Sequence, residues 1–154
     1  MQKIQTRRGT AADVEAIFQM IDGYAQKAIM LPRSRELLHR IIHTFIIAED
    51  DNGFVGCGSL TRLGSDLVEI RSLGIIDGYK GKGAGSAIVQ GLVEMAREEN
   101  TPKVMALTYA VDFFKKNGFD VVSMDIFPEK VWKDCVHCPK QQNCDEIAML
   151  KVLK

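Results

Sequence analysis

The chain has 154 residues, of which 46% are hydrophobic and 26% are charged, with a formal net charge of zero. This length allows one domain with a sizeable core, so we expect a single domain over 1–154. Balanced charge argues against a dedicated nucleic-acid binder, which would carry a basic excess. No apolar run approaches a membrane span, and MQKIQTRRGT at the N-terminus lacks the apolar stretch of a signal peptide. We therefore expect a cytoplasmic protein whose cysteines are thiols or metal ligands.

The predicted elements, taken in chain order, are typical of an α+β domain with a mixed sheet. Two helices begin after Thr10 and Ser34, which are suitable N-caps, a third follows the glycine-rich segment near residue 80, and a fourth spans Val111–Lys116. Hydrophobic patterns and turn residues place the strands at Ile4–Arg7, Phe45–Ala48, Phe54–Leu60, Val68–Ile76, Val104–Thr108, Phe119–Met124 and Ile147–Val152. The order β-α-α-β-β-β-α-β-α-β-β predicts the α+β class.

The segment Val68–Met95 carries the strongest functional signal. An apolar strand runs into a turn of glycines and lysines, residues 80–85, and then directly into an amphipathic helix. The first N–H groups of a helix have no intrahelical partner, and the helix dipole places positive potential there. Glycines let a phosphate approach the backbone, and Lys80 and Lys82 add positive charge. We therefore expect the protein to bind a phosphorylated cofactor.

The glycine spacing distinguishes between phosphate-binding motifs. Gly81, Gly83 and Gly85 form G-x-G-x-G, in which the third glycine is misplaced for the dinucleotide fingerprint. The P-loop requires Gly-Lys followed by Ser or Thr, which does not occur in the chain. The pattern [Q/R/K]-x-x-G-x-G, which begins here at Lys80, resembles the acetyl-CoA pyrophosphate loop of the GNAT N-acetyltransferases. The competing interpretation is a surface turn that happens to be rich in glycine and lysine.

The resemblance to GNAT proteins covers essentially the whole chain. The element order matches the GNAT fold, a mixed central sheet with a splayed pair of strands between helices, and Asp112–Phe119 is similar to the family's FYxxxGF helix and cap. Leu31–Ser34 and Lys130–Cys135, with the cysteines that follow, resemble the short single-domain bacterial N-acetylglutamate synthases. The resemblance implies an enzyme that transfers acetyl from acetyl-CoA to the α-amine of L-glutamate, the first step of arginine biosynthesis.

The resemblance also implies where acetyl-CoA would bind. In GNAT proteins the central strand separates from its neighbour, and its free backbone groups bind the pantetheine and the acetyl oxygen. The matching residues here are Leu73, Gly74 and Ile75. The pyrophosphate would lie on the loop and the first helical turn, formed by Lys80, Gly81, Lys82, Gly83, Ala84, Gly85 and Ser86.

Two residues are candidates for proton transfer. Glu69 on the central strand matches the carboxylate that removes the amine proton in many GNAT enzymes. The alternative is an ordinary sheet-surface glutamate paired with Arg71, since alternation puts both side chains on one face. The family's usual thiolate acid is a tyrosine, but Phe114 occupies that position here. Tyr109, at the end of the preceding strand, is the nearest phenol and our candidate for the acid.

A glutamate substrate brings carboxylates, for which arginine is the natural partner because it forms two parallel hydrogen bonds with them. The resemblance implies that Arg33, in the loop between the first two helices, binds a substrate carboxylate. Arg71 and Ser72 on the central strand are the next candidates, and Lys133 is a weaker one. The competing interpretation of Arg33 is a solvated arginine on a loop.

A cysteine-rich excursion, 135–144, precedes the last strand. It contains Cys135, Cys138 and Cys144. C-x2-C is a recurrent zinc motif, and His137 or Asp145 would be the fourth ligand. A full zinc site normally shows four clear ligands, so we expect no bound metal and keep zinc as the alternative. Cys57 stands alone and is expected to be a small buried residue.

Three functions remain open from the sequence. The first is synthesis of N-acetylglutamate, and the second is acetylation of another small amine or of a protein N-terminus. The third is a non-catalytic regulatory module that binds acetyl-CoA. This function remains open because phenylalanine replaces the usual tyrosine at position 114. We expect a small-molecule amino-acid substrate and no nucleic-acid or membrane partner. A homodimer and the choice between glutamate and glutamine are not decided by the sequence.

Overall fold

The computed structural model describes residues 3–27, 32–123, 126 and 147–153. Its helices are α1 (Val14–Gln26), α2 (Arg35–Ile41), α3 (Ala84–Glu98) and α4 (Val111–Lys116), with short 3-10 turns at Ala11–Asp13 and Ile42–Thr44. Its strands are β1 (Gln5–Arg8), β2 (Phe45–Asp50), β3 (Gly53–Gly64), β4 (Leu67–Ile75), β5 (Lys103–Thr108), β6 (Asp120–Val122) and β7 (Ile147–Val152). Among the described residues, no helix is long and apolar enough to cross a membrane.

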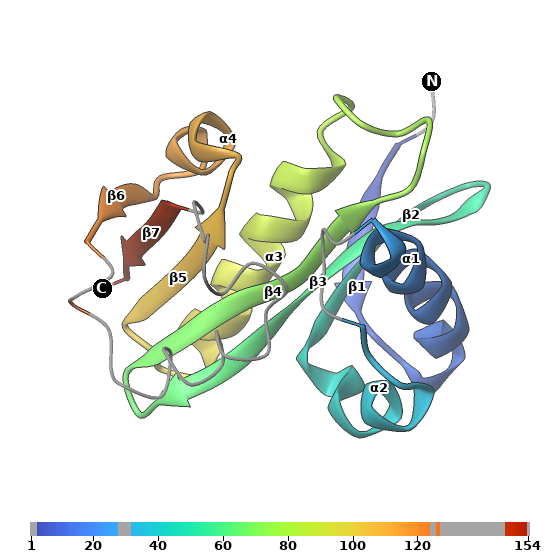
Figure 1. The fold of residues 1–154 in the computed structure, drawn as a ribbon, viewed down its shortest axis with the longest axis horizontal. Coiled ribbons are helices and arrows are strands. Elements are labelled where there is room, and N and C mark those ends of the chain that lie inside the picture. Colours follow the sequence, from blue (N-terminus) through green and yellow to red (C-terminus); the bar gives the residue numbers. More distant parts are fainter. Residues whose placement is uncertain (1–2, 28–31, 124–125, 127–146, 154) are drawn as a thin grey trace.

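The strands form one mixed sheet in the order β1-β2-β3-β4-β5-β7-β6. Within the described sheet, β4 and β5 are parallel and every other neighbouring pair is antiparallel. In Figure 1, α3 passes behind the sheet, whereas α1 and α2 lie in front of it. The predicted α+β class with a mixed, helix-flanked sheet is confirmed. The prediction of a single domain over 1–154 stays a prediction.

Helices cover both faces of the sheet, which explains why β2 is apolar without alternation. Phe45 and Ile47 pack with α1 and α2, whereas Ile46 and Ala48 pack with α3. All four side chains are buried. Successive strand residues point to opposite faces, so an unbroken apolar run is what a doubly covered strand requires.

Several predicted boundaries agree with the structure, and two strands differ clearly in length from the prediction. Ser34 caps α2, because its hydroxyl accepts a hydrogen bond from the Leu37 N–H at 3.0 Å. Gly118 ends α4 with φ of +92°, as expected for a glycine after a helix. Strand β3 continues past Leu60 to Gly64, because these residues pair with the start of β4. Strand β6 is shorter than predicted and ends at Val122.

The ladder between β4 and β5 is short. Its last pair joins Glu69 to Met105, after which β4 continues to Ile75 and β5 to Thr108 without pairing with each other. Figure 1 shows the two strands diverging beyond their paired ends. The splayed pair of strands expected from the resemblance is therefore present.

A bulge in β4 accompanies this separation. Cys57 of β3 pairs with Gly74, but Ser59 pairs with Arg71, so β4 holds one extra residue between the two pairs. Ser72 lies at this point with φ of +56°, in the left-handed region that favours glycine. A bulge bends its strand and increases the local twist, so it directs the end of β4 away from β5.

Strand β1 is tied to the start of α1 by a buried carboxylate. Arg7 donates from Nη1 and Nη2 to the two Asp13 oxygens, at 2.8 Å each, and from Nε to Glu49 at 2.9 Å. The Thr10 N–H also donates to Asp13, at 2.7 Å. The hydrogen bonds from Arg7 are the main reason why the pKa of Asp13 lies below its usual value.

We expect Asp13→Asn to lower the free energy of unfolding by about 1–3 kcal/mol at neutral pH, because Arg7 loses a charged acceptor. The folded pKa of Asp13 is depressed, so its stabilising effect is present above its unfolded pKa and is lost as pH falls through the folded pKa. Urea titrations from neutral pH to about pH 2 should show that the free energy of unfolding falls more steeply with acidification in the wild type than in the variant. Glu98→Gln, in the exposed Arg8–Glu98 pair, is the control and should change stability by less than about 1 kcal/mol.

Candidate functional site

The site begins on the face of β4 that points away from α3. Val68 and Ile70 pack in the α3 cluster, so the alternating Glu69 and Arg71 point to the face that carries α1 and α2. Arg33 lies just before α2, and its charge interacts with both of these side chains. Arg33 is thereby brought together with Glu69 and Arg71, which lie far from it in the sequence.

Glu69 and Arg71 form an ion pair in which Arg71 Nε donates to Glu69 Oε1 at 2.7 Å. The Glu69 side chain is only 8% exposed and that of Arg71 is 24% exposed. The predicted pairing is present, but the description of Glu69 as a surface glutamate is wrong. A buried carboxylate needs a charged partner, because burial alone disfavours its ionised form.

Arg33 is half-buried and makes no hydrogen bond or ion pair within the described part of the chain. Burial, followed by repulsion from Arg71, lowers the pKa of the Arg33 guanidinium, and attraction to Glu69 offsets part of this effect. The competing interpretation of a solvated loop arginine is therefore wrong. Two guanidinium groups and one carboxylate give this cluster an excess positive charge, which favours an anionic ligand.

The open edge of β4 presents backbone groups. The Ile76 N–H donates to the Val55 carbonyl at 2.9 Å, so by alternation Gly74 also directs its backbone groups toward β3. Leu73 and Ile75 direct theirs toward the opened side. Gly74 instead provides space, since a Cβ there would lie 2.8 Å from Met20 and 2.9 Å from Tyr24.

The glycine-rich loop between β4 and α3 is exposed and depends on left-handed glycines. Gly81 and Gly83 have φ of +79° and +87°. Helix α3 starts at Ala84, and its first backbone hydrogen bond runs from the Ala87 N–H to the Gly83 carbonyl at 3.1 Å. The amides of Ala84, Gly85 and Ser86 therefore belong to the first helical turn, where N–H groups have no intrahelical acceptor.

The first turn of α3 packs against α4. A Cβ on Gly85 would lie 3.1 Å from the ring of Phe113, so this close packing favours glycine. Asn117 Nδ2 donates to the Ser86 hydroxyl at 3.2 Å and to the Phe113 carbonyl at 2.9 Å. Sequence reasoning assigned no role to Asn117 beyond ending a helix.

The family's usual position for the thiolate acid, here Phe114, and the proposed acid Tyr109 differ in their surroundings. Phe114 is buried and packs edge-to-face against both Phe113 and Phe119, so this position belongs to the core. Tyr109 directly follows β5 and is 50% exposed. It therefore lies at the open end of the splayed strands, where a proton donor to the leaving thiolate would have to be.

Tyr24 was missed by the sequence analysis. Its hydroxyl donates to the Ile75 carbonyl at 2.7 Å, although the two residues are 51 positions apart. The residue belongs to no motif, and its helix position is typical of any half-buried aromatic residue. No signal in the sequence identifies this contact.

Four predicted residues lie outside the described residues: Lys133, Cys135, Cys138 and Cys144. The zinc alternative is therefore untested. Among the described residues, no group of three or more His, Cys, Asp or Glu side chains could hold a metal ion. Cys57 is fully buried in β3, as predicted.

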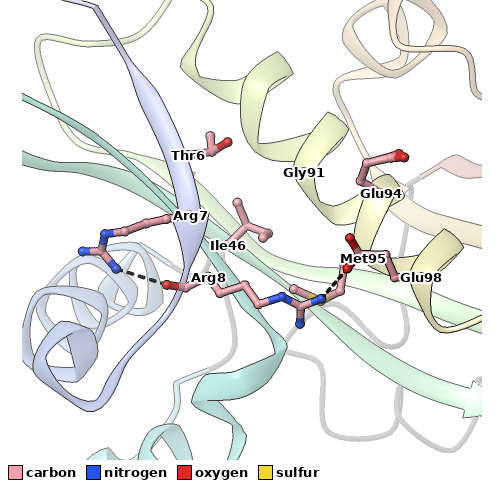
Figure 2. A pocket seen from close by; sticks show the side chains of 8 residues that line it. All are labelled: Thr6, Arg7, Arg8, Ile46, Gly91, Glu94, Met95 and Glu98. Carbon is pink, nitrogen blue, oxygen red and sulfur yellow. Dashed lines mark hydrogen bonds and ion pairs between the residues drawn. The ribbon is translucent and has the colours of Figure 1, made fainter.

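A separate pocket lies between β1 and α3. Its lining comprises Thr6, Arg7, Arg8, Ile46, Gly91, Glu94, Met95 and Glu98. Figure 2 shows the Arg8 side chain crossing it to form an ion pair with Glu98, at 2.7 Å. None of the site residues predicted from the sequence lines this pocket. Its charged side chains all have ion-pair partners, since Arg7 pairs with Asp13 and Glu49, and Glu94 pairs with Arg97, outside the pocket lining.

The chain matches the acetyltransferase (GNAT) family over residues 13–119. It is 37% identical over 147 residues to an uncharacterized N-acetyltransferase of Chlorobaculum tepidum, covering 96% of this chain and 95% of that protein. It is 39% identical over 116 residues to an amino-acid acetyltransferase of Mycobacterium tuberculosis, covering 73% of this chain and 66% of the relative.

Solved structures show the same fold. A Mycobacterium tuberculosis protein in complex with CoA is 30% identical, with a TM-score of 0.84, and the match covers 97% of this chain and 99% of that one. The N-acetylglutamate synthase of Neisseria gonorrhoeae, complexed with coenzyme A and N-acetyl-glutamate, is 27% identical with a TM-score of 0.85, over 99% of this chain and 35% of that one. This chain therefore spans about a third of the length of the gonococcal synthase. The chain belongs to the GNAT acetyltransferase family and is an acetyl-CoA-dependent acyltransferase.

Proposed function

We propose that the protein transfers the acetyl group of acetyl-CoA to the α-amine of L-glutamate. The observation that carries the proposal is Arg33, a half-buried guanidinium without a partner in the described part of the chain, beside the Glu69–Arg71 pair. An arginine in this state is stabilised by a carboxylate ligand, which restores the charge interactions lost on burial. Relatives named amino-acid acetyltransferase and a neighbour named N-acetylglutamate synthase support the same substrate class.

The charge balance favours a substrate with more than one carboxylate. The ammonium of an amino acid would be attracted to Glu69 and repelled by the two guanidinium groups. The α-carboxylate of an amino acid only cancels the charge of its own ammonium, so a second carboxylate is needed to balance the net positive charge of the three side chains. Ser72, at the bulge beside Arg71, is proposed to add a hydroxyl contact. Glutamate meets these requirements better than glutamine, whose side chain is neutral.

The reaction requires a neutral amine, because only the free amine can attack the thioester carbonyl. In the proposed mechanism Glu69 takes a proton from the ammonium, directly or through water. The amine nitrogen then bonds to the acetyl carbon and releases its second proton to solvent, and the carbon–sulfur bond breaks. Coenzyme A leaves as a thiolate and takes up a proton, for which Tyr109 is the proposed donor.

Acetyl-CoA is proposed to bind along the opened edge of β4 and on the loop that follows it. Backbone groups of Leu73 and Ile75 face this edge and suit the amides of pantetheine. The first-turn amides of α3, together with Lys80 and Lys82, suit the pyrophosphate. Positioning by these groups, together with backbone dipoles directed at the acetyl oxygen, would supply much of the rate enhancement.

A thiol-release assay with each of the twenty amino acids, run with a fixed acetyl-CoA concentration, tests the function directly. Glutamate should give the highest kcat/KM. Higher turnover with glutamine, with an amine lacking a carboxylate, or with peptide N-termini would support the second function considered from the sequence. Binding of acetyl-CoA without turnover of any amine would support a regulatory module.

We expect Gly83→Asp to weaken acetyl-CoA binding at least tenfold in calorimetry, because the new carboxylate would repel the pyrophosphate and a side chain is strained at φ of +87°. Gly53→Asp is the matched control. Gly53 also has a positive φ, +112°, and open space around it, but it lies in the β2–β3 hairpin. Similar losses of affinity in both variants would contradict the assignment of the phosphate loop.

Glu69→Gln should lower kcat by about 10²–10³ near neutral pH if Glu69 accepts the amine proton. The loss should shrink as pH rises, because a larger share of the substrate is then already the free amine. The measurement is a kcat profile from about pH 6 to 10 for both proteins. A parallel loss at every pH would indicate that Glu69 only orients Arg71.

Arg33→Ala should raise the KM for glutamate by about 10- to 100-fold and leave the KM for acetyl-CoA almost unchanged, since a substrate carboxylate loses a charged partner. Arg35→Ala is the control, because Arg35 is exposed at the start of α2 and pairs with Glu15. Equal effects of Arg33→Ala on both substrates would point to a folding defect.

A further inference from the structure

Tyr24 of α1 contacts the acetyl-CoA side of the site at three points. Its hydroxyl donates to the Ile75 carbonyl at 2.7 Å. Its ring lies so close to Gly74 that a Cβ there would be 2.9 Å from Tyr24 Cε2. The Lys80 ammonium is 5.5 Å from the centre of the same ring. One side chain thus connects α1 to the end of β4 and to the start of the glycine-rich loop.

The hydrogen bond to Ile75 replaces one that the sheet does not make. Ile75 directs its N–H and C=O toward the opened side of β4, where β5 no longer pairs with it. The Tyr24 hydroxyl donates a hydrogen bond to this carbonyl, which has no partner within the described sheet. The Ile75 N–H also points toward the open edge. The hydrogen bond from Tyr24 to the Ile75 carbonyl helps to fix its orientation.

Resting on the proposed function, we infer that Tyr24 is a positioning residue for acetyl-CoA. Because the Tyr24 hydroxyl already bonds the Ile75 carbonyl, the Ile75 N–H is the group left to bind a ligand at this point of the strand. This N–H suits a carbonyl oxygen of the pantetheine arm and not an amide N–H. By packing on Gly74, it holds the last residues of β4 against α1. The residue acts through the strand and touches none of the reacting atoms.

The test compares Tyr24→Phe, which removes only the hydroxyl, with the wild-type protein. Calorimetry should show the Kd for CoA raised about five- to tenfold, the loss expected for one hydrogen bond. Adenosine 3′,5′-bisphosphate, which lacks the pantetheine, should bind both proteins equally. The KM for the amine substrate should also stay unchanged. Tyr79→Phe is the matched control, because the Tyr79 hydroxyl makes no hydrogen bond within the described residues and its ring packs on the core.

Two further variants examine the packing. Tyr24→Leu removes the ring as well and should weaken the binding of both CoA and the bisphosphate, because Lys80 loses its contact with the ring.

Gly74→Ala displaces the ring and should weaken CoA binding in the wild-type background. The effect should be much smaller in Tyr24→Phe, where the hydrogen bond is already absent.

An unchanged CoA affinity in Tyr24→Phe would overturn the inference, as would equal losses for CoA, the bisphosphate and the amine substrate. The calorimetric measurements with CoA and the bisphosphate do not require turnover, so their outcome is distinguishable from a failure of the proposed function. A protein that binds CoA but does not acetylate glutamate would contradict the substrate assignment and leave the role of Tyr24 to be decided by the binding data.

Discussion

The separation of β4 from β5 after Glu69 is the constraint on which both halves of the site depend. A strand within a sheet has its backbone groups paired on both sides, and buried groups without partners are rare in proteins. The bulge at Ser72 turns β4 away from β5 and leaves one edge of Leu73 and Ile75 without a strand partner. Such an edge requires a ligand or a side chain to satisfy it. Tyr24 satisfies one carbonyl, and the remaining groups are where a cofactor with amides can bind.

In the proposed mechanism the same strand serves two substrates, because it offers two independent directions. Its side chains stand perpendicular to the sheet, so Glu69 and Arg71 point toward the face that carries α1 and α2, where Arg33 joins them. Its backbone groups lie in the plane of the sheet and point into the opening. An amine substrate on the face and an acetyl-CoA in the opening would therefore meet on one strand without competing for the same contacts. In this proposal the side-chain and backbone groups lie within a few residues of each other on β4, so no flexible linker would separate the two substrates.

The sequence predicted those parts of the site that depend on neighbours along the chain. The phosphate loop is local, since glycines with positive φ and the start of a helix are adjacent in the chain. Element order, the cap at Ser34 and the Glu69–Arg71 pairing follow from equally local rules. Burial of Arg33 and the contact between Tyr24 and Ile75 depend on how distant elements pack, and no periodicity encodes them. The requirement for a glycine at position 74 was not predicted for the same reason, because it comes from Met20 and Tyr24 on α1.

Cys57 adds a consequence for how the protein's motions could be followed. It lies in β3 opposite Gly74, fully buried, with its Sγ donating to the Ser72 carbonyl at 3.6 Å. Burial raises the pKa of its thiol well above the usual value. Because the thiolate is the reactive form, thiol reagents reach this residue only when the sheet opens beside the bulge. In a protein with its other cysteines replaced by serine, the labelling rate of Cys57 would report local opening beside the strand that carries the proposed site, through a probe that the natural chain already contains.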